Sequence, residues 1–141
     1  MAEIEKILSN YNLQRRNQST KINVEEIESI INFKIPQDYK FYAINYIENE
    51  IFLKNEFIRL WNFNDLLELN TEYGILNSLK NTVAIGSNGS SEFIAIEFLD
   101  IKECSVVLSP FIDLDEKYHI EIGNSFTDFF KRLEKGINWF D

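Results

Sequence analysis

The residues that could act as a nucleophile and its base are few. The chain contains one histidine, His119, and one cysteine, Cys104, so a Cys–His or Ser–His site would need His119 as its base. His119 falls in an expected strand over residues 118–122, on the more polar of its two faces, which favours a surface histidine. Cys104 opens another expected strand and is typical of a small buried hydrophobe. We therefore predict no catalytic residues and no enzyme.

Metal and phosphate sites have no better support. One cysteine and one histidine are too few ligands for zinc, and the acidic run 113–116 (DLDE) lacks the glycine and final glutamate of an EF-hand loop. The segment 86–89 (GSNG) is followed by no lysine and leads into a strand, unlike a phosphate-binding loop. Arg15 and Arg16 have no glycine-rich turn or helix start beside them, so we expect solvated loop charges. No spacing singles out a carboxylate pair for hydrolysis, and we predict no metal and no cofactor.

Composition limits the classes of partner. The 141 residues fit a single domain, 1–141, with a continuous core, and the net charge is -9. Such a surface repels nucleic acid and anionic membrane and attracts a basic protein, although acidity can also serve solubility alone. A single cysteine, no signal-peptide pattern in MAEIEKILSNYNL and no long apolar run lead us to expect a cytoplasmic protein that uses no membrane.

The apolar pattern predicts which elements position these residues. Helical spacing predicts helices over residues 2–11, 23–31, 36–46, 62–73 and 125–135, with a polar, exposed loop over 12–21 and another loop over 75–81. In the third helix we expect three tyrosines at the edge of the core, with their hydroxyls in water. In the fourth, Leu66, Leu69 and Tyr73 are expected to face inward. In the last, Ser125 and Asp128 match an N-terminal capping pattern and Gly136 a helix stop.

Strands fill the rest of the chain. They are predicted over residues 51–53, 57–61, 83–85, 93–98, 104–108 and 118–122. Asn88-Gly89 between apolar runs is a strong hairpin signal, and this loop is also one that a partner could contact. The fold class is therefore predicted as α+β, with an antiparallel sheet of about five or six strands and helices packed mainly on one face.

Four segments, taken in order, resemble the SUKH superfamily, which includes bacterial immunity proteins and a fungal regulator of cell-wall synthesis. They run from the second helix to the last: Ile35-Pro36-Gln37-Asp38-Tyr39, Ile58-Arg59-Leu60-Trp61 with Leu66, Val83-Ala84-Ile85-Gly86-Ser87-Asn88-Gly89 with Glu92, and Asn124-Ser125-Phe126-Thr127-Asp128-Phe129. Two departures are Glu48-Asn49-Glu50, where the family often has a glycine pair, and Ser91, which replaces the last glycine of the hairpin motif.

The resemblance implies a SUKH-like fold and a non-enzymatic protein that binds and neutralises a bacterial toxin, frequently a nuclease. A regulatory or scaffold module that binds a cellular protein is the alternative. Nuclease toxins are often basic, so we expect a basic protein partner that contacts acids on loops and strand ends. The predicted contact residues are Glu48, Glu50, Asp113, Asp115 and Glu116, together with Asn88 of the hairpin loop. The outward acids Glu25, Glu26 and Glu28 are a second choice.

Overall fold

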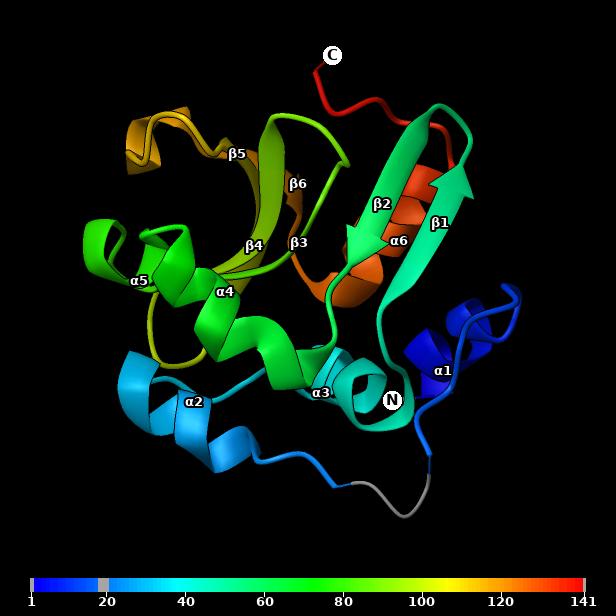
Figure 1. The fold of residues 1–141 in the computed structure, drawn as a ribbon. Coiled ribbons are helices and arrows are strands. Elements are labelled where there is room, and N and C mark those ends of the chain that lie inside the picture. Colours follow the sequence, from blue (N-terminus) through cyan, green and yellow to red (C-terminus); the bar gives the residue numbers. More distant parts are fainter. Residues whose placement is uncertain (1, 18–20, 141) are drawn as a thin grey trace.

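The computed structural model describes residues 2–17 and 21–140 (Figure 1). Its centre is a single antiparallel sheet in which each strand pairs with the next along the chain. Its six strands are β1 (Asn49–Leu53), β2 (Glu56–Leu60), β3 (Thr82–Ser87), β4 (Glu92–Phe98), β5 (Cys104–Pro110) and β6 (Ile120–Gly123). The predicted antiparallel α+β fold is thereby confirmed.

Helices precede, interrupt and follow the sheet. They are α1 (Ala2–Leu8), α2 (Val24–Ile31), α3 (Gln37–Asn45), α4 (Leu66–Glu72), α5 (Ile75–Ser78) and α6 (Phe126–Glu134), with 3-10 turns η1 (Phe63–Asp65) and η2 (Glu116–Tyr118). The loop predicted over 75–81 is wrong for residues 75–78, because Gly74 (φ 75°) reverses the chain and α5 follows, with Ile75 and the next residue after the helix, Leu79, buried against the sheet. None of these helices has the length and apolar character that a bilayer crossing requires within residues 2–17 and 21–140.

The inner face of the sheet carries the main core. Residues from α1, α2, α3 and α6 join the inward residues of every strand there. Helix α6 begins as predicted, since the Ser125 hydroxyl accepts a hydrogen bond from the Asp128 backbone N–H (2.9 Å), a cap that contributes about 1 kcal/mol. Its residues Phe126, Phe129 and Phe130 are at most 2% exposed and contact one another edge to face or tilted. These three rings form the buried face of α6.

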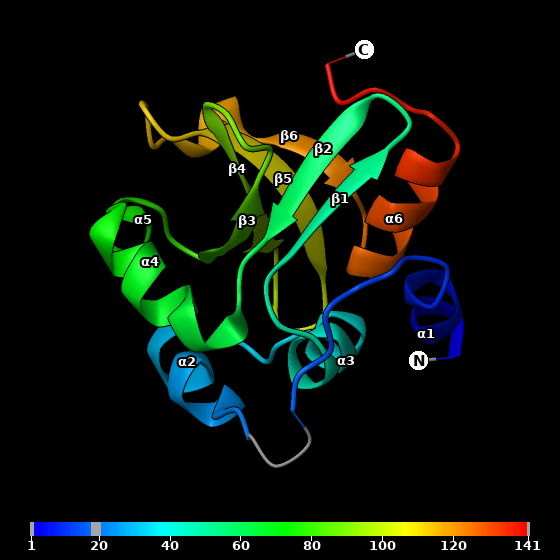
Figure 2. The same cartoon turned by 45° about the vertical axis from the view of Figure 1, so that its right-hand side comes forward.

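The outer face is covered over only part of its width. Ala84, Phe93, Ala95 and Val107 of the central strands pack with α5 in a second, smaller core. In Figure 2, α4 and α5 lie on one side of the sheet while α1 and α6 lie on the other. The front of the β1–β2 hairpin, by contrast, has no described helix across it, and α6 lies behind it (Figure 1). The sheet therefore leaves one stretch of its outer face open.

Helix α4 is tied to the sheet by a polar residue. Asn70 is fully buried, and its side-chain amide accepts from the Ala84 N–H (2.8 Å) and donates to the Ala84 carbonyl (2.9 Å). The prediction for this helix is half wrong: Leu66 is buried, whereas Tyr73 is 48% exposed. At Ala84 the strand β2 has diverged from β3, and the carboxamide of Asn70 supplies the hydrogen bonds that a neighbouring strand would otherwise make. For this reason a polar side chain occupies a position of α4 that faces the sheet.

A glycine permits β2 and β3 to meet. These strands pair only at Arg59–Ser87 and Leu60–Gly86, next to a bulge in β3. A Cβ atom on Gly86 would lie 2.2 Å from the Arg59 carbonyl oxygen, so only glycine allows this approach. The orientation of the β1–β2 hairpin relative to β3–β6 depends on it.

The expectation of solvated loop charges is wrong for Arg16, which is 7% exposed. Its Nε donates to the Ala43 carbonyl (3.1 Å), and its Nη2 donates to the Tyr46 carbonyl (3.0 Å) and to Asn62 Oδ1 (2.9 Å). The carbonyls at the C-terminal end of a helix lack intrahelical partners, and Arg16 supplies donors for those at the end of α3. Residues 18–20 of the predicted loop lie outside the described residues.

The tyrosines of α3 are also more buried than predicted. Tyr39 and Tyr42 are each 1% exposed. Tyr42 donates to the Ile47 carbonyl (2.8 Å) and accepts from Asn49 Nδ2 (3.1 Å), whereas the Tyr39 hydroxyl has no hydrogen-bond partner among the described residues. Burial raises the pKa of both phenols above the ordinary value of 10.0. At the C-terminal end of α3, residues 14–16 pair with residues 45–47, through the Arg16–Asn45 and Ile47–Gln14 backbone hydrogen bonds and the Arg15–Tyr46 bridge.

Candidate partner-binding face

A groove of about 510 Å³ lies at the open part of the outer face, between the ends of β1 and β2, the start of α4 and residues 12–14. Three acids line it, Glu48, Glu50 and Asp65, against one cation, Arg59. The indole of Trp61 forms part of the wall. Two of the predicted contact residues, Glu48 and Glu50, thus belong to one concave surface.

The β1–β2 register places the charged residues of the groove. Glu50 and Arg59 are cross-strand partners whose side chains point to the outer face, and Arg59 Nη2 lies 2.8 Å from Glu50 Oε2. Both side chains are about half exposed (57% and 49%), so this pair contributes little to stability. Glu48 and Asp65 form no ion pair with any described residue. Two carboxylates of the groove therefore keep an unneutralised charge.

The back of the groove is rigid because Asn49, 5% exposed, is fully hydrogen-bonded. Its Oδ1 accepts from the Gln14 N–H (2.6 Å), and its Nδ2 lies within hydrogen-bond distance of the Gln14 carbonyl and the Tyr42 hydroxyl. Asn49 thereby holds Gln14 against the start of β1.

A row of aromatic rings connects the groove to the acidic loop between β5 and β6. Trp61 stacks on Tyr73 (6.0 Å between centroids, 14°), Tyr73 meets Phe111 (4.7 Å), and Phe111 meets Phe93 (5.2 Å). Phe111 and Leu114 pack into the second core, so the loop is anchored from beneath. The groove and the loop therefore belong to the same side of the molecule.

The acids of this loop project from its anchored base. Asp113 and Glu116 are exposed, and Asp115 is partly buried because its Oδ1 accepts from the Lys117 N–H (3.0 Å) at the start of η2. Asp115 Oδ2 also lies 3.9 Å from Lys117 Nζ. Asp113 and Glu116 form no ion pair with any residue in the part of the chain described. The structure thus joins these three predicted residues to Glu48 and Glu50 through the aromatic row.

Asn88 shapes the hairpin loop. Its Oδ1 accepts from the N–H groups of Ser90 (3.0 Å) and Glu92 (3.2 Å), and its Nδ2 donates to Glu92 Oε1 (2.7 Å). The next residue, Gly89, has φ 76° and lies over the ring of Phe57, where a Cβ atom would approach to 2.7 Å. The loop therefore sits at the edge of the open face, with the side chain of Asn88 committed to its internal bonds.

Trp61, Asp65 and the exposed ring of Phe52 complete the face, and the sequence analysis did not assign them to it. Phe52 is 75% exposed, and its ring centroid lies 5.5 Å from that of Phe57. A signal existed in the alternation of Phe57 and Arg59 on β2 with Trp61 directly after it, because this alternation places three large side chains on one face. Nothing local indicated that α4 would leave this face uncovered.

The surface histidine expected at position 119 is wrong, because the His119 side chain is 4% exposed. Its Nδ1 lies 3.1 Å from Glu97 Oε2. Cys104 is partly buried, and burial raises the pKa of its thiol, which disfavours the nucleophilic thiolate. Within residues 2–17 and 21–140, no three His, Cys, Asp or Glu side chains gather as a metal site would require. His119 and Cys104 instead complete the packing at the β4–β5–β6 end of the sheet.

Comparison with known families finds one match that spans most of the chain. The family model described as SMI1 / KNR4 family (SUKH-1) matches residues 18–132 of this chain, which include every strand and most of α6. No curated protein matches the chain.

Proposed function

Because the chain belongs to the SMI1 / KNR4 family (SUKH-1), we propose that it is an immunity protein that binds and neutralises a cognate bacterial toxin. The observation that carries the proposal is the groove, in which Glu48, Glu50 and Asp65 surround Trp61 on an uncovered sheet face. The partner it fits is a basic protein, and nuclease toxins are often basic because their substrate is anionic.

The groove has the features of a binding hot spot. An indole supplies a large apolar contact surface at low entropic cost, and it lies beside carboxylates that can receive a lysine or arginine side chain. Glu48 and Asp65 are already without counter-ions, so a cation from the partner displaces no internal salt bridge there. Asp113 and Glu116, at the far end of the aromatic row, extend the negative potential and steer the encounter.

The experiment uses the protein encoded beside this gene as the candidate toxin. Co-expression of this chain should rescue bacterial growth from that toxin, and the purified pair should associate more slowly as salt is raised. The variant Glu48→Gln/Asp65→Asn should lower the association rate about fivefold at low salt. Glu5→Gln/Glu103→Gln makes the same charge change at exposed positions outside the groove and is the matched control.

The outcomes separate the competing interpretations. Rescue with a salt-insensitive rate, equal for both double variants, would show that the acidity serves solubility alone. Absence of rescue, together with binding of a cellular protein through Trp61, would replace immunity by the regulatory or scaffold role. In either case thermal unfolding of the variants provides the check that the fold is intact.

Neutralisation is proposed to need no chemistry from this chain. The variant Cys104→Ser/His119→Gln should protect within a few-fold of the natural protein, provided that it folds. Loss of protection in a folded variant, with toxin binding retained, would indicate a catalytic contribution and overturn this part of the proposal.

A further inference from the structure

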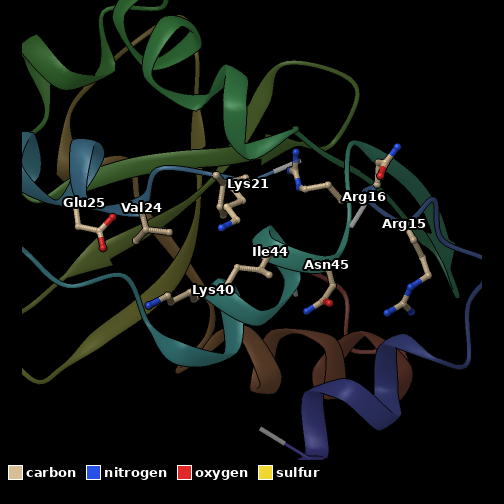
Figure 3. A pocket seen from close by; sticks show the side chains of 10 residues that line it. Arg15, Arg16, Lys21, Val24, Glu25, Lys40, Ile44 and Asn45 are labelled. Carbon is tan, nitrogen blue, oxygen red and sulfur yellow. The ribbon is translucent and has the colours of Figure 1, made fainter. Parts of the chain in front are cut away.

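A second hollow, of about 480 Å³, lies on the other side of the segment that borders the acidic groove (Figure 3). It is enclosed by residues 15–17 and 21–22, the start of α2 and the outward side of α3. Its charged residues are Arg15, Arg16, Lys21 and Lys40, with Glu25 as its one acid. In a chain with 14 basic and 23 acidic residues, this excess of positive charge is local and unexpected.

The positive charge is not neutralised from within. No described carboxylate forms an ion pair with any of the four cations. Arg16 is more than nine-tenths buried, yet among the described residues its side chain donates hydrogen bonds only to two backbone carbonyls and the amide oxygen of Asn62. A buried charge without a counter-ion is unfavourable, so an anion in the hollow would be stabilised by it.

The cationic side chains are held in place or reach into the same space. The Arg15 guanidinium lies over the Tyr46 ring (4.9 Å) and donates to the Tyr46 hydroxyl (3.1 Å). In Figure 3, Lys21 and Lys40 extend around the space in front of Ile44, with Arg15 at one end and Glu25 at the other. The four cations therefore all line one hollow.

The hollow also has an apolar wall. Ile22, Val24 and Ile44 line it, and Ile44 is 46% exposed although it lies on a helix with a buried opposite face. Binding sites for small molecules combine such a wall with a few convergent polar groups, in volumes of about 300–1,000 Å³. An inorganic ion would use the cations and leave the apolar wall in water.

We propose that this hollow binds a small organic anion, in which a phosphate or carboxylate group is attached to an apolar body. The anionic group would lie between Lys21 and Lys40 under the field of Arg16, and the body would cover Ile44. This inference is independent of toxin binding, since the hollow is separated from the acidic groove by residues 12–17.

Phenyl phosphate is the probe, with benzyl alcohol as its uncharged counterpart and inorganic phosphate as its counterpart without a body. In NMR titrations of the full chain, phenyl phosphate should shift the amide signals of Val24, Ile44 and Asn45 saturably. Each counterpart should bind at least about tenfold more weakly, the factor expected when one of two cooperating contacts is lost. Lys21→Gln/Lys40→Gln should weaken binding of phenyl phosphate about tenfold, whereas the control Lys80→Gln/Lys102→Gln should leave it unchanged.

Three results would overturn the proposal. They are no saturable shift at about 10 mM phenyl phosphate, equal affinity for inorganic phosphate, and tighter binding of a glutamate-rich peptide that displaces phenyl phosphate. The last result would assign the hollow to an acidic protein segment. The variant Glu48→Gln/Asp65→Asn should still bind phenyl phosphate, so failure here is distinguishable from failure of the proposed function.

Discussion

Replacing Asn70 by leucine should cost the protein a large part of its stability. The side chain is fully buried and satisfies both the N–H and the carbonyl of Ala84. Leucine has a similar volume, so the substitution removes the hydrogen bonds without opening a large cavity. Two backbone groups then remain buried without partners, at about 1–3 kcal/mol each. The expected loss is about 4 kcal/mol, against a total of about 5–15 kcal/mol for a typical domain.

The measurement is urea unfolding followed by far-ultraviolet circular dichroism, with the midpoint and slope fitted separately. An unchanged slope shows that the loss is one of stability and not a change in the surface exposed on unfolding. Thr71→Ala is the matched control, because Thr71 is the next residue of α4 and is exposed, and its hydroxyl bonds only to the Leu67 carbonyl. It should change the free energy of unfolding by no more than about 0.5 kcal/mol. A loss below about 1 kcal/mol for Asn70→Leu would refute the assignment of Asn70 as the tether of α4.

Three further outcomes are expected. Gly86→Ala should destabilise the protein by about 3 kcal/mol in the same unfolding assay, since its Cβ would lie 2.2 Å from the Arg59 carbonyl oxygen; a neutral result would show that β2 and β3 separate freely. Tyr39→Phe should be neutral or stabilising by about 1 kcal/mol, whereas Tyr42→Phe, which loses a bond to the Ile47 carbonyl, should cost about 1 kcal/mol; equal effects would contradict the assigned hydroxyl partners. Because burial raises the pKa of Tyr39 and Tyr42 above 10.0, only the unfolded chain releases these protons just above pH 10. Stability should therefore be full below pH 10 and fall above it by about 1.4 kcal/mol per pH unit for each tyrosine, and Tyr39→Phe should remove the contribution of Tyr39.

Elements whose signals lie within a few neighbouring residues could be predicted from the sequence. Ser125 caps α6 through a residue three positions away, and the phenylalanines of that helix repeat with its own period. Asn88-Gly89 defines the central hairpin in the same local way, although the strands run a residue or more beyond the predicted limits. Such elements need no knowledge of the rest of the chain.

The errors concern residues whose partners are distant in sequence. Arg16 was expected to be a solvated loop charge, but it donates to the carbonyls of Ala43 and Tyr46, which are distant in sequence. Asn70 takes the inward position on α4 because its side chain binds the peptide groups of Ala84 on β3, where β2 has diverged. His119 is buried because Glu97, two strands away along the chain, covers its Nδ1. The residues adjacent in sequence do not indicate any of these environments.

The candidate site likewise combines residues that were predicted from the sequence with residues that were not. Charge and expected exposure led to the prediction of Glu48, Glu50 and the acidic loop between β5 and β6 as contacts, and this stays a prediction. The groove itself also needs Trp61 and Asp65, which come from the end of β2 and from η1 and acquire a role only when α4 leaves the hairpin uncovered. The basic hollow was not foreseen, because Lys40 lies on a helix well separated in sequence from Arg15 and Lys21.

The position of α6 in the chain has a consequence during protein synthesis. All six strands are complete at Gly123, yet Phe126, Phe129 and Phe130, which fill the inner core, follow them. Thr127 then bonds through its N–H and its hydroxyl to Asp38 (2.8 Å each), which locks the late helix onto an early one. A nascent chain on the ribosome therefore displays a sheet with an open apolar face until this helix emerges. Since ribosomes add about 5–20 residues per second, residues 124–134 require about 0.5–2 s of synthesis after Gly123, and the sheet lacks its last helix for at least that time.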